Sequence, residues 1–200
     1  MVRQFDDEEA EYDAYATVTD EERFAPLRTA ALGLFSDLAQ LYEVTASATF
    51  EASASMSLIL HSYPPITLIP LGSGAPLSVA FPSAVSLVLR CGWWYANAFP
   101  WCSCDACNLT LAHEAERLAR VCASVVAGGF HEAIDTSPSW HGMSQVSHAF
   151  IGASGGGSGQ TAIPSALAAR MRGARPAVSA WAPWVRRVRV AAIGAEQPGT

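Results

Sequence analysis

The chain of 200 residues contains no lysine, and all twelve of its basic residues are arginine. A protein without lysine cannot form a Schiff base, use a lysine as general base, or bind phosphate with the lysine of a phosphate-binding loop. Acidic residues outnumber arginines eighteen to twelve, which gives a formal net charge of −6. That balance does not suit a general nucleic-acid binder, whose surface has to be basic. The composition therefore excludes several enzyme classes and makes nucleic acid an unexpected partner.

A leader and a long hydrophobic run are also missing. The N-terminus is acidic and lacks the charged-then-apolar pattern of a secretory signal. The most apolar stretch, residues 56–90, is broken by prolines and glycine, so it does not supply the ~20 unbroken apolar residues of a membrane span. Cysteine is scarce, and an odd total of five without a leader favours a reducing compartment. We expect a cytoplasmic protein with no membrane partner.

Charge is distributed unevenly along the chain. Residues 1–23 contain nine of the eighteen acids, whereas residues 136–200 contain six arginines and one acid. A run of like charges at a chain end is typical of a solvated arm, and the remaining length fits one domain that buries its own core. We predict an acidic flexible arm at residues 1–16, a single α+β domain at 17–190 and a disordered tail at 191–200.

Hydrophobic periodicity predicts two main helices separated by short strands. Apolar residues recur at spacings of three and four after Pro26 and again over residues 108–127, as in helices that bury one face. Thr19 and Glu22 have the spacing of a capping box ahead of the first helix. Segments rich in β-forming residues indicate strands at 44–54, 66–70, 77–81, 84–91, 93–99 and 145–151. Together they predict an α+β fold: an antiparallel β-meander sheet with the two main helices packed on one face.

Three of the five cysteines lie within six positions, at Cys102, Cys104 and Cys107. The two-residue spacing of Cys104 and Cys107 lets both sulfurs meet one ion at a turn, and Cys102 can add a third thiolate. Zinc prefers four tetrahedral ligands, so a distant His131, His141 or His148 would have to complete the set. The segment is therefore a candidate zinc site whose fourth ligand is unknown.

The same cysteines allow two other interpretations. A Cys-x-x-Cys at the N-terminus of a helix is the placement of thiol-redox proteins, although Asp105 between the thiols opposes thiolate formation. Alternatively, the cysteines stay reduced and pack in a tight structural turn beneath Trp93, Trp94, Phe99 and Trp101, because cysteine behaves as a small buried hydrophobe.

Two further polar patterns are weaker. Residues 152–156 read Gly-Ala-Ser-Gly-Gly and match the serine-nucleophile pattern, but no histidine or aspartate follows Ser154. We interpret residues 152–160 as a linker or a weak anion-binding loop. His131 and Glu132 offer acid–base groups, but as neighbours on a helix they would diverge by about 100°.

Several segments carry a family resemblance, namely residues 19–27, 75–79, 98–107, 125–130 and 181–184. The most specific, residues 98–107, reads Ala-Phe-Pro-Trp-Cys-Ser-Cys-Asp-Ala-Cys. Together they resemble an uncharacterised actinobacterial family, a domain of unknown function. The resemblance implies one intact cytoplasmic domain and transfers no catalytic residues. This chain departs from the family in residues 52–89, which contain no charged residue.

These patterns lead to one main hypothesis and one alternative. The main hypothesis is a non-enzymatic domain that binds a protein partner or a small ligand, with a structural cysteine turn and with Trp181 and Trp184 as candidate binding residues. The alternative is a zinc-binding or thiol-redox protein centred on Cys102, Cys104 and Cys107.

Overall fold

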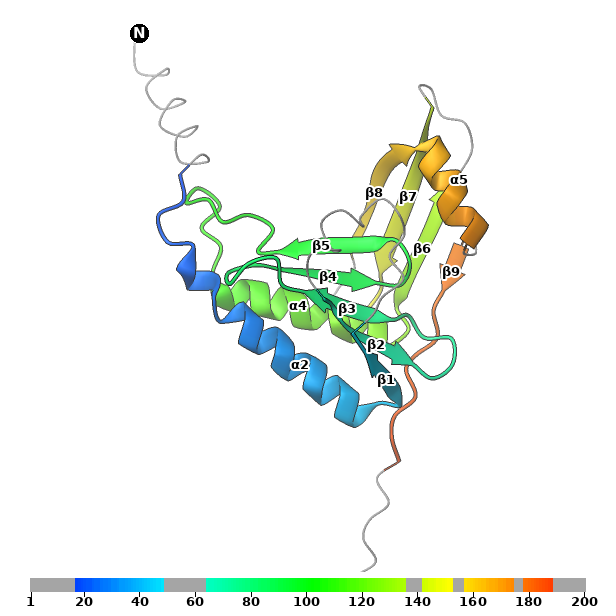
Figure 1. Cartoon of the computed structure of the whole chain (residues 1–200), viewed down its shortest axis with the longest axis horizontal. Helices are drawn as coiled ribbons and strands as arrows, with labels where there is room; N and C mark the ends of the chain where they lie inside the picture. Colours follow the sequence, from blue (N-terminus) through cyan, green and yellow to red (C-terminus); the bar gives the residue numbers. More distant parts are fainter. Residues whose placement is uncertain (1–16, 49–63, 136–141, 153–156, 175–177, 189–200) are drawn as a thin grey trace, which may run out of the picture.

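The computed structural model describes residues 17–48, 64–135, 142–152, 157–174 and 178–188. Within them the predicted α+β fold is confirmed, with two antiparallel sheets and helices packed against them (Figure 1). The proposed arm at residues 1–16 and tail at 191–200 lie outside the described residues, as do His141 and residues 153–156 of the glycine-serine segment. In the part of the chain that is described, no helix is long and apolar enough to cross a membrane.

The first sheet is the predicted meander. Its strands lie in sequence order, each antiparallel to the next: β1 (Val44–Ser47), β2 (Ile66–Pro70), β3 (Leu77–Ala80), β4 (Leu87–Cys91) and β5 (Tyr95–Phe99). Strands β4 and β5 form a hairpin in which Cys91 pairs with Tyr95. Gly92 turns this hairpin with a φ of +61°, a left-handed conformation that glycine adopts without strain.

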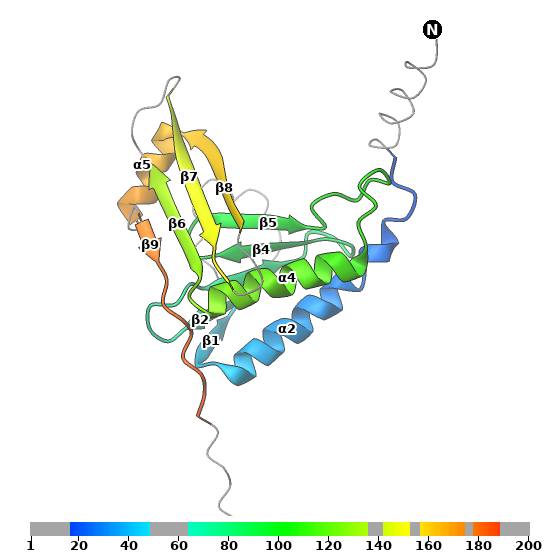
Figure 2. The same ribbon diagram turned by 180° about the vertical axis from the view of Figure 1, so that it is seen from behind.

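Helices α2 (Leu27–Leu41) and α4 (Leu111–Val126) lie side by side on one face of this sheet, as Figure 2 shows. Their apolar stripes bury Phe35 from α2 and Leu118 from α4 against the strands. Helix α4 is also held at its start, because Arg117 pairs with the fully buried Glu114 and donates to the Ala98 carbonyl at 2.9 Å. This contact fixes α4 against β5, and therefore fixes both ends of the cysteine segment between them.

A second sheet was not predicted. Its strand order is β8-β7-β6-β9, formed by β6 (Phe130–Asp135), β7 (Met143–Phe150), β8 (Gly157–Pro164) and β9 (Val178–Ala180). Helix α5 (Ser165–Ala174) packs on it through Leu167 and Met171, together with Trp94 from the β4–β5 hairpin. The interpretation of residues 152–160 as a linker is wrong for residues 157–160, because they are paired with β7.

The chain returns from the second sheet to the first through residues 181–187. Trp184 is a core residue at 4% exposure, and its indole donates to the Ala75 carbonyl at 2.9 Å. The backbone of Arg187 donates to the Leu41 carbonyl at the end of α2. This strap joins the two sheets and the C-terminal end of α2 into one packed unit.

Candidate metal centre

The cysteine segment forms a turn between the end of β5 and the start of α4. Asn108 closes it by donating its amide to the Asp105 carbonyl at 3.2 Å, with a φ of +44° that asparagine tolerates better than most residues. Helix α4 begins only at Leu111, where the Thr110 hydroxyl accepts a hydrogen bond from the His113 amide. The helix predicted from residue 108 therefore starts three residues later, and the three cysteines lie wholly within the turn.

The turn brings three sulfur atoms together. The Sγ atoms of Cys102, Cys104 and Cys107 all lie within 4.8 Å of one another, and those of Cys102 and Cys104 are 3.0 Å apart. Four ligands placed tetrahedrally about 2.3 Å from zinc are about 3.8 Å apart, so the observed cluster is of the size that one ion requires. Cys104 is 4% exposed, whereas Cys102 and Cys107 are half-buried. An ion there would sit at the edge of the fold with one side open.

The electrostatics of the cluster favour a cation. A hydrogen bond from the Cys102 thiol, and after it bonds from the thiol and amide of Cys107 and the amide of Ala106, lowers the pKa of the Cys104 thiol, although burial opposes this shift. Hydrogen bonding to Cys102 and Cys104 raises the pKa of Cys107 to about 12. Three thiolates this close would repel one another, so all three can be deprotonated together only with a positive ion between them. A bound divalent metal supplies that charge and deprotonates its thiol ligands.

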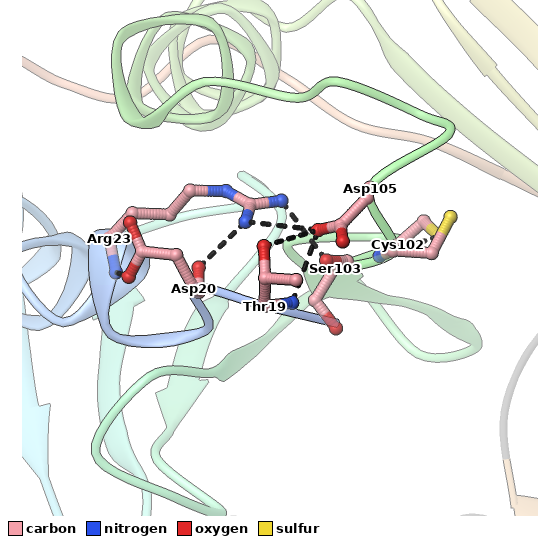
Figure 3. Close-up of polar contacts among 7 residues, drawn as sticks. Thr19, Asp20, Arg23, Cys102, Ser103 and Asp105 are labelled. Carbon is pink, nitrogen blue, oxygen red and sulfur yellow. Dashed lines mark hydrogen bonds and ion pairs between the residues drawn. The ribbon is translucent and has the colours of Figure 1, made fainter. Parts of the chain in front are cut away.

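The opposite side of the turn holds the N-terminal segment, residues 17–23. Asp105 accepts hydrogen bonds from the backbone and the hydroxyl of Thr19, both at 3.2 Å, while Arg23 donates to the Ser103 carbonyl at 3.0 Å. Figure 3 shows the Asp105 carboxylate directed toward Thr19 and Arg23, and the Cys102 side chain directed away from them. The predicted capping box is wrong, because Thr19 bonds to Asp105. At the start of the 3-10 helix η1 (Glu22–Phe24) it is the Asp20 carboxylate that accepts a hydrogen bond from the Arg23 amide, at 3.2 Å.

The expected fourth ligand is not found among the described residues. No fourth histidine, cysteine or acid joins the cluster there, and Asp105 is committed to the N-terminal segment. His131 and His148 lie on the second sheet: His131 lines a groove of about 560 Å³ with Ser147, while His148 packs against Tyr95. Burial lowers the pKa of His148. Both lie outside the sulfur cluster in the structure as described.

The structure differs from one expected feature of each of the two alternative interpretations of the turn. The thiols precede Leu111, where α4 begins, and so do not occupy a helix N-terminus as in a thioredoxin-like site. The expected cover of tryptophans is also wrong, because Trp101 is 60% exposed and Trp94 belongs to the core of the second sheet. The cysteines are brought together by their own turn.

The two remaining cysteines provide a contrast for chemical labelling. Cys91 and Cys122 are fully buried, and burial raises the pKa of Cys122 to about 12 and that of Cys91 well above its usual value. Because the reagent has to reach the sulfur atom, we expect iodoacetamide to modify the half-buried Cys102 and Cys107 in the folded, metal-free protein and all five cysteines after unfolding. Peptide mass spectrometry would locate the labels. Native labelling of Cys91 or Cys122 would contradict this assignment.

A second polar centre surrounds Glu132, which the sequence places beside His131 on a helix but which lies on strand β6. Glu132 is 2% exposed, and its carboxylate accepts from the amides of Trp93 at 2.7 Å and Trp94 at 2.9 Å and from the Trp181 indole at 3.2 Å. A Cβ on Gly92 would collide with this carboxylate. Burial, partly offset by these bonds, raises the pKa of Glu132 to about 7. The sequence did contain a signal for this strand. Phe130, Glu132 and Ile134 occupy every second position after the Gly128-Gly129 helix stop, which is the spacing of side chains on one face of a strand.

Trp181 and Trp184 serve the fold's own packing. Trp181 bonds to Glu132 and lies against Trp93, with ring centroids 5.0 Å apart, while Trp184 packs edge-on against Tyr42. Their role toward a partner stays a prediction.

The fold and the site together define an α+β protein with two antiparallel sheets and a three-cysteine centre capable of holding a metal ion. The chain belongs to DUF6226, a family of unknown function, whose model matches residues 2–188. The expected membership of a family of unknown function is thus confirmed. Comparison with curated proteins found no match, and neither did comparison with solved structures.

Proposed function

We propose that this protein is a non-enzymatic metal-binding domain in which Cys102, Cys104 and Cys107 hold one zinc ion. The observation that carries the proposal is the convergence of their three sulfurs within 4.8 Å. Thiolates are the donors that zinc favours in structural sites, and zinc brings no redox chemistry of its own.

The role of the ion in this proposal is to hold the turn. The turn carries no regular secondary structure, yet it links β5 to α4 and contacts residues 17–23. Binding at three points along six residues restricts a backbone that otherwise depends on a few hydrogen bonds, such as that from Asn108 to Asp105. Solvent or a donor from outside the described residues takes the fourth position.

Metal content tests the proposal directly. We expect protein purified without chelator to contain close to one equivalent of zinc by elemental analysis, because three convergent thiolates bind it tightly. The Cys104→Ser variant should lose nearly all of it, since the most buried of the three ligands is removed.

Two controls make this result specific. His113→Gln removes an exposed histidine near the turn that lies outside the sulfur cluster, and should leave the zinc content unchanged. Cys122→Ala removes a buried core thiol and should also retain zinc. Wild-type protein that is free of metal after purification and takes up none from added zinc would rule the proposal out.

A further inference from the structure

The contacts between the N-terminal segment and the cysteine turn fall on residues that alternate with the metal ligands. Ser103 lies between Cys102 and Cys104, and Asp105 lies between Cys104 and Cys107. Ser103 supplies a carbonyl to Arg23, and Asp105 supplies both its amide and its carboxylate. The backbone that would be restricted by a metal is thus the backbone that holds residues 17–23.

The contacts themselves are several and individually modest. The Asp105 amide donates to the Thr17 carbonyl at 3.0 Å, and Asp105 Oδ1 accepts from the Thr19 amide and hydroxyl at 3.2 Å each. Arg23 Nη1 lies 3.9 Å from the same oxygen, in an ion pair whose side chains are 22% and 30% exposed. Partly exposed pairs of this kind contribute little alone. The segment is held by the sum of bonds that share one short stretch of backbone, so a change in that stretch weakens all of them together.

Buried residues at the start of α2 limit how much of the N-terminal segment can leave the cysteine turn. Phe24 is fully buried, and Leu27 in the first turn of α2 is 1% exposed. Arg23 lies directly before Phe24, with its guanidinium 4.7 Å from the centre of that ring. Residues 17–23 can therefore leave the turn while Phe24 keeps α2 anchored in the core.

We propose that metal binding at Cys102, Cys104 and Cys107 and docking of residues 17–23 onto the turn are coupled, so that metal occupancy controls whether the N-terminal segment is held. This inference rests on the proposed function and adds its regulation. Two equilibria that share one ordered element influence each other equally. Metal binding orders Ser103 and Asp105 and strengthens docking, and docking in turn strengthens metal binding.

Hydrogen exchange measured on the full chain with and without zinc tests whether metal binding strengthens the docking of residues 17–23. The Thr19 and Asp105 amides both donate across the contact, so peptides covering residues 17–24 and 102–108 should exchange at least ~10-fold more slowly with zinc bound. Peptides from the central turns of α2 serve as the internal reference and should not change. Equal exchange of residues 17–24 in the zinc-bound and zinc-free proteins would overturn the coupling.

Zinc affinity measured by competition with a chromophoric chelator tests whether docking of residues 17–23 strengthens metal binding. The double variant Thr19→Val with Arg23→Met keeps all three cysteines and removes the side-chain contacts to the turn. We expect about 10-fold weaker zinc binding, at the lower end of the range for groups bonded directly to metal ligands, because Thr19 and Arg23 bond to the residues between the ligands. Arg28→Met is the matched control: it removes the same charge from an exposed arginine that lies over the Phe81 ring instead, and its affinity should be unchanged.

The outcomes separate this inference from the function on which it rests. Zinc that does not bind to the wild-type chain overturns both. Zinc that binds to the wild type, is lost on Cys104→Ser, and binds to the double variant with wild-type affinity overturns the coupling alone. Should the double variant fold poorly, the exchange measurement on the wild-type chain still decides the question.

Discussion

Chelation of zinc is expected to lower the free energy of unfolding by about 4 kcal/mol relative to protein kept in free zinc at 1,000 times its dissociation constant. A ligand that binds only the folded state stabilises it by this mass-action amount. For a chain of this size the corresponding fall in melting temperature is roughly 10 °C. Circular dichroism or calorimetry at matched zinc and chelator concentrations would measure it.

Removal of zinc should destabilise the protein without unfolding it completely. Zinc-finger peptides are unfolded without metal because they have no other core. Here α2, α4 and the first sheet bury a large apolar cluster, including Phe24, Leu118 and Phe130, to which none of the three cysteines of the turn belongs. The Cys104→Ser variant should remain folded and show no zinc-dependent melting shift, and His113→Gln should behave as wild type. A shift of equal size in Cys104→Ser would place the zinc elsewhere.

The second large effect concerns pH and Glu132. Burial raises its pKa in the folded protein to about 7 from an ordinary 4.5. Between these values the folded state holds a proton that the unfolded chain has released, so the free energy of unfolding falls as pH rises from 4.5 to 7 and levels off above 7. The shift corresponds to about 3 kcal/mol. Arg90 nearby, whose pKa burial lowers to about 10, stays protonated throughout this range.

Urea unfolding at several pH values between 5 and 8 measures this contribution. Glu132→Gln cannot titrate, and it keeps an acceptor for only one of the Trp93 and Trp94 amides, because these bond to different carboxylate oxygens. The loss of that bond lowers stability equally at every pH, whereas the titration should make the difference in stability between wild type and variant change by about 2.5 kcal/mol across the range. Glu116→Gln is the control, because Glu116 is exposed and pairs with Arg120 on the surface of α4. A wild-type-minus-variant difference that stays constant with pH would refute the assignment.

The placement of Glu132 explains why its effect should be structural. Its two oxygens meet the hairpin amides from the first sheet and the Trp181 indole from the strap, while its backbone belongs to β6. Bonds to a carboxylate are stronger than neutral ones, and they offset part of the cost of burying it. This residue therefore clamps the two sheets together at the β4–β5 hairpin.

Local patterns along the chain were sufficient to predict the meander, both main helices and the segment in which chemistry is concentrated. Short strands separated by proline and glycine, and apolar residues at helical spacing, are signals that each segment carries by itself. The second sheet lacked such signals. Strand β8 contains two glycines and is mostly exposed, and β9 is three residues long, so pairing with neighbours rather than propensity makes them strands.

The amino-acid sequence by itself determined the absence of lysine chemistry, the acidic balance and the spacing that allows three thiols to meet. Only the tertiary structure decided that Asp105 turns away from those thiols to hold Thr19 and Arg23, and that Glu132 is buried between two sheets. The reason is physical. Spacing along a turn controls contacts over a few residues, whereas the partner of a buried or bridging carboxylate is supplied by chain tens of residues away, and only packing brings it near.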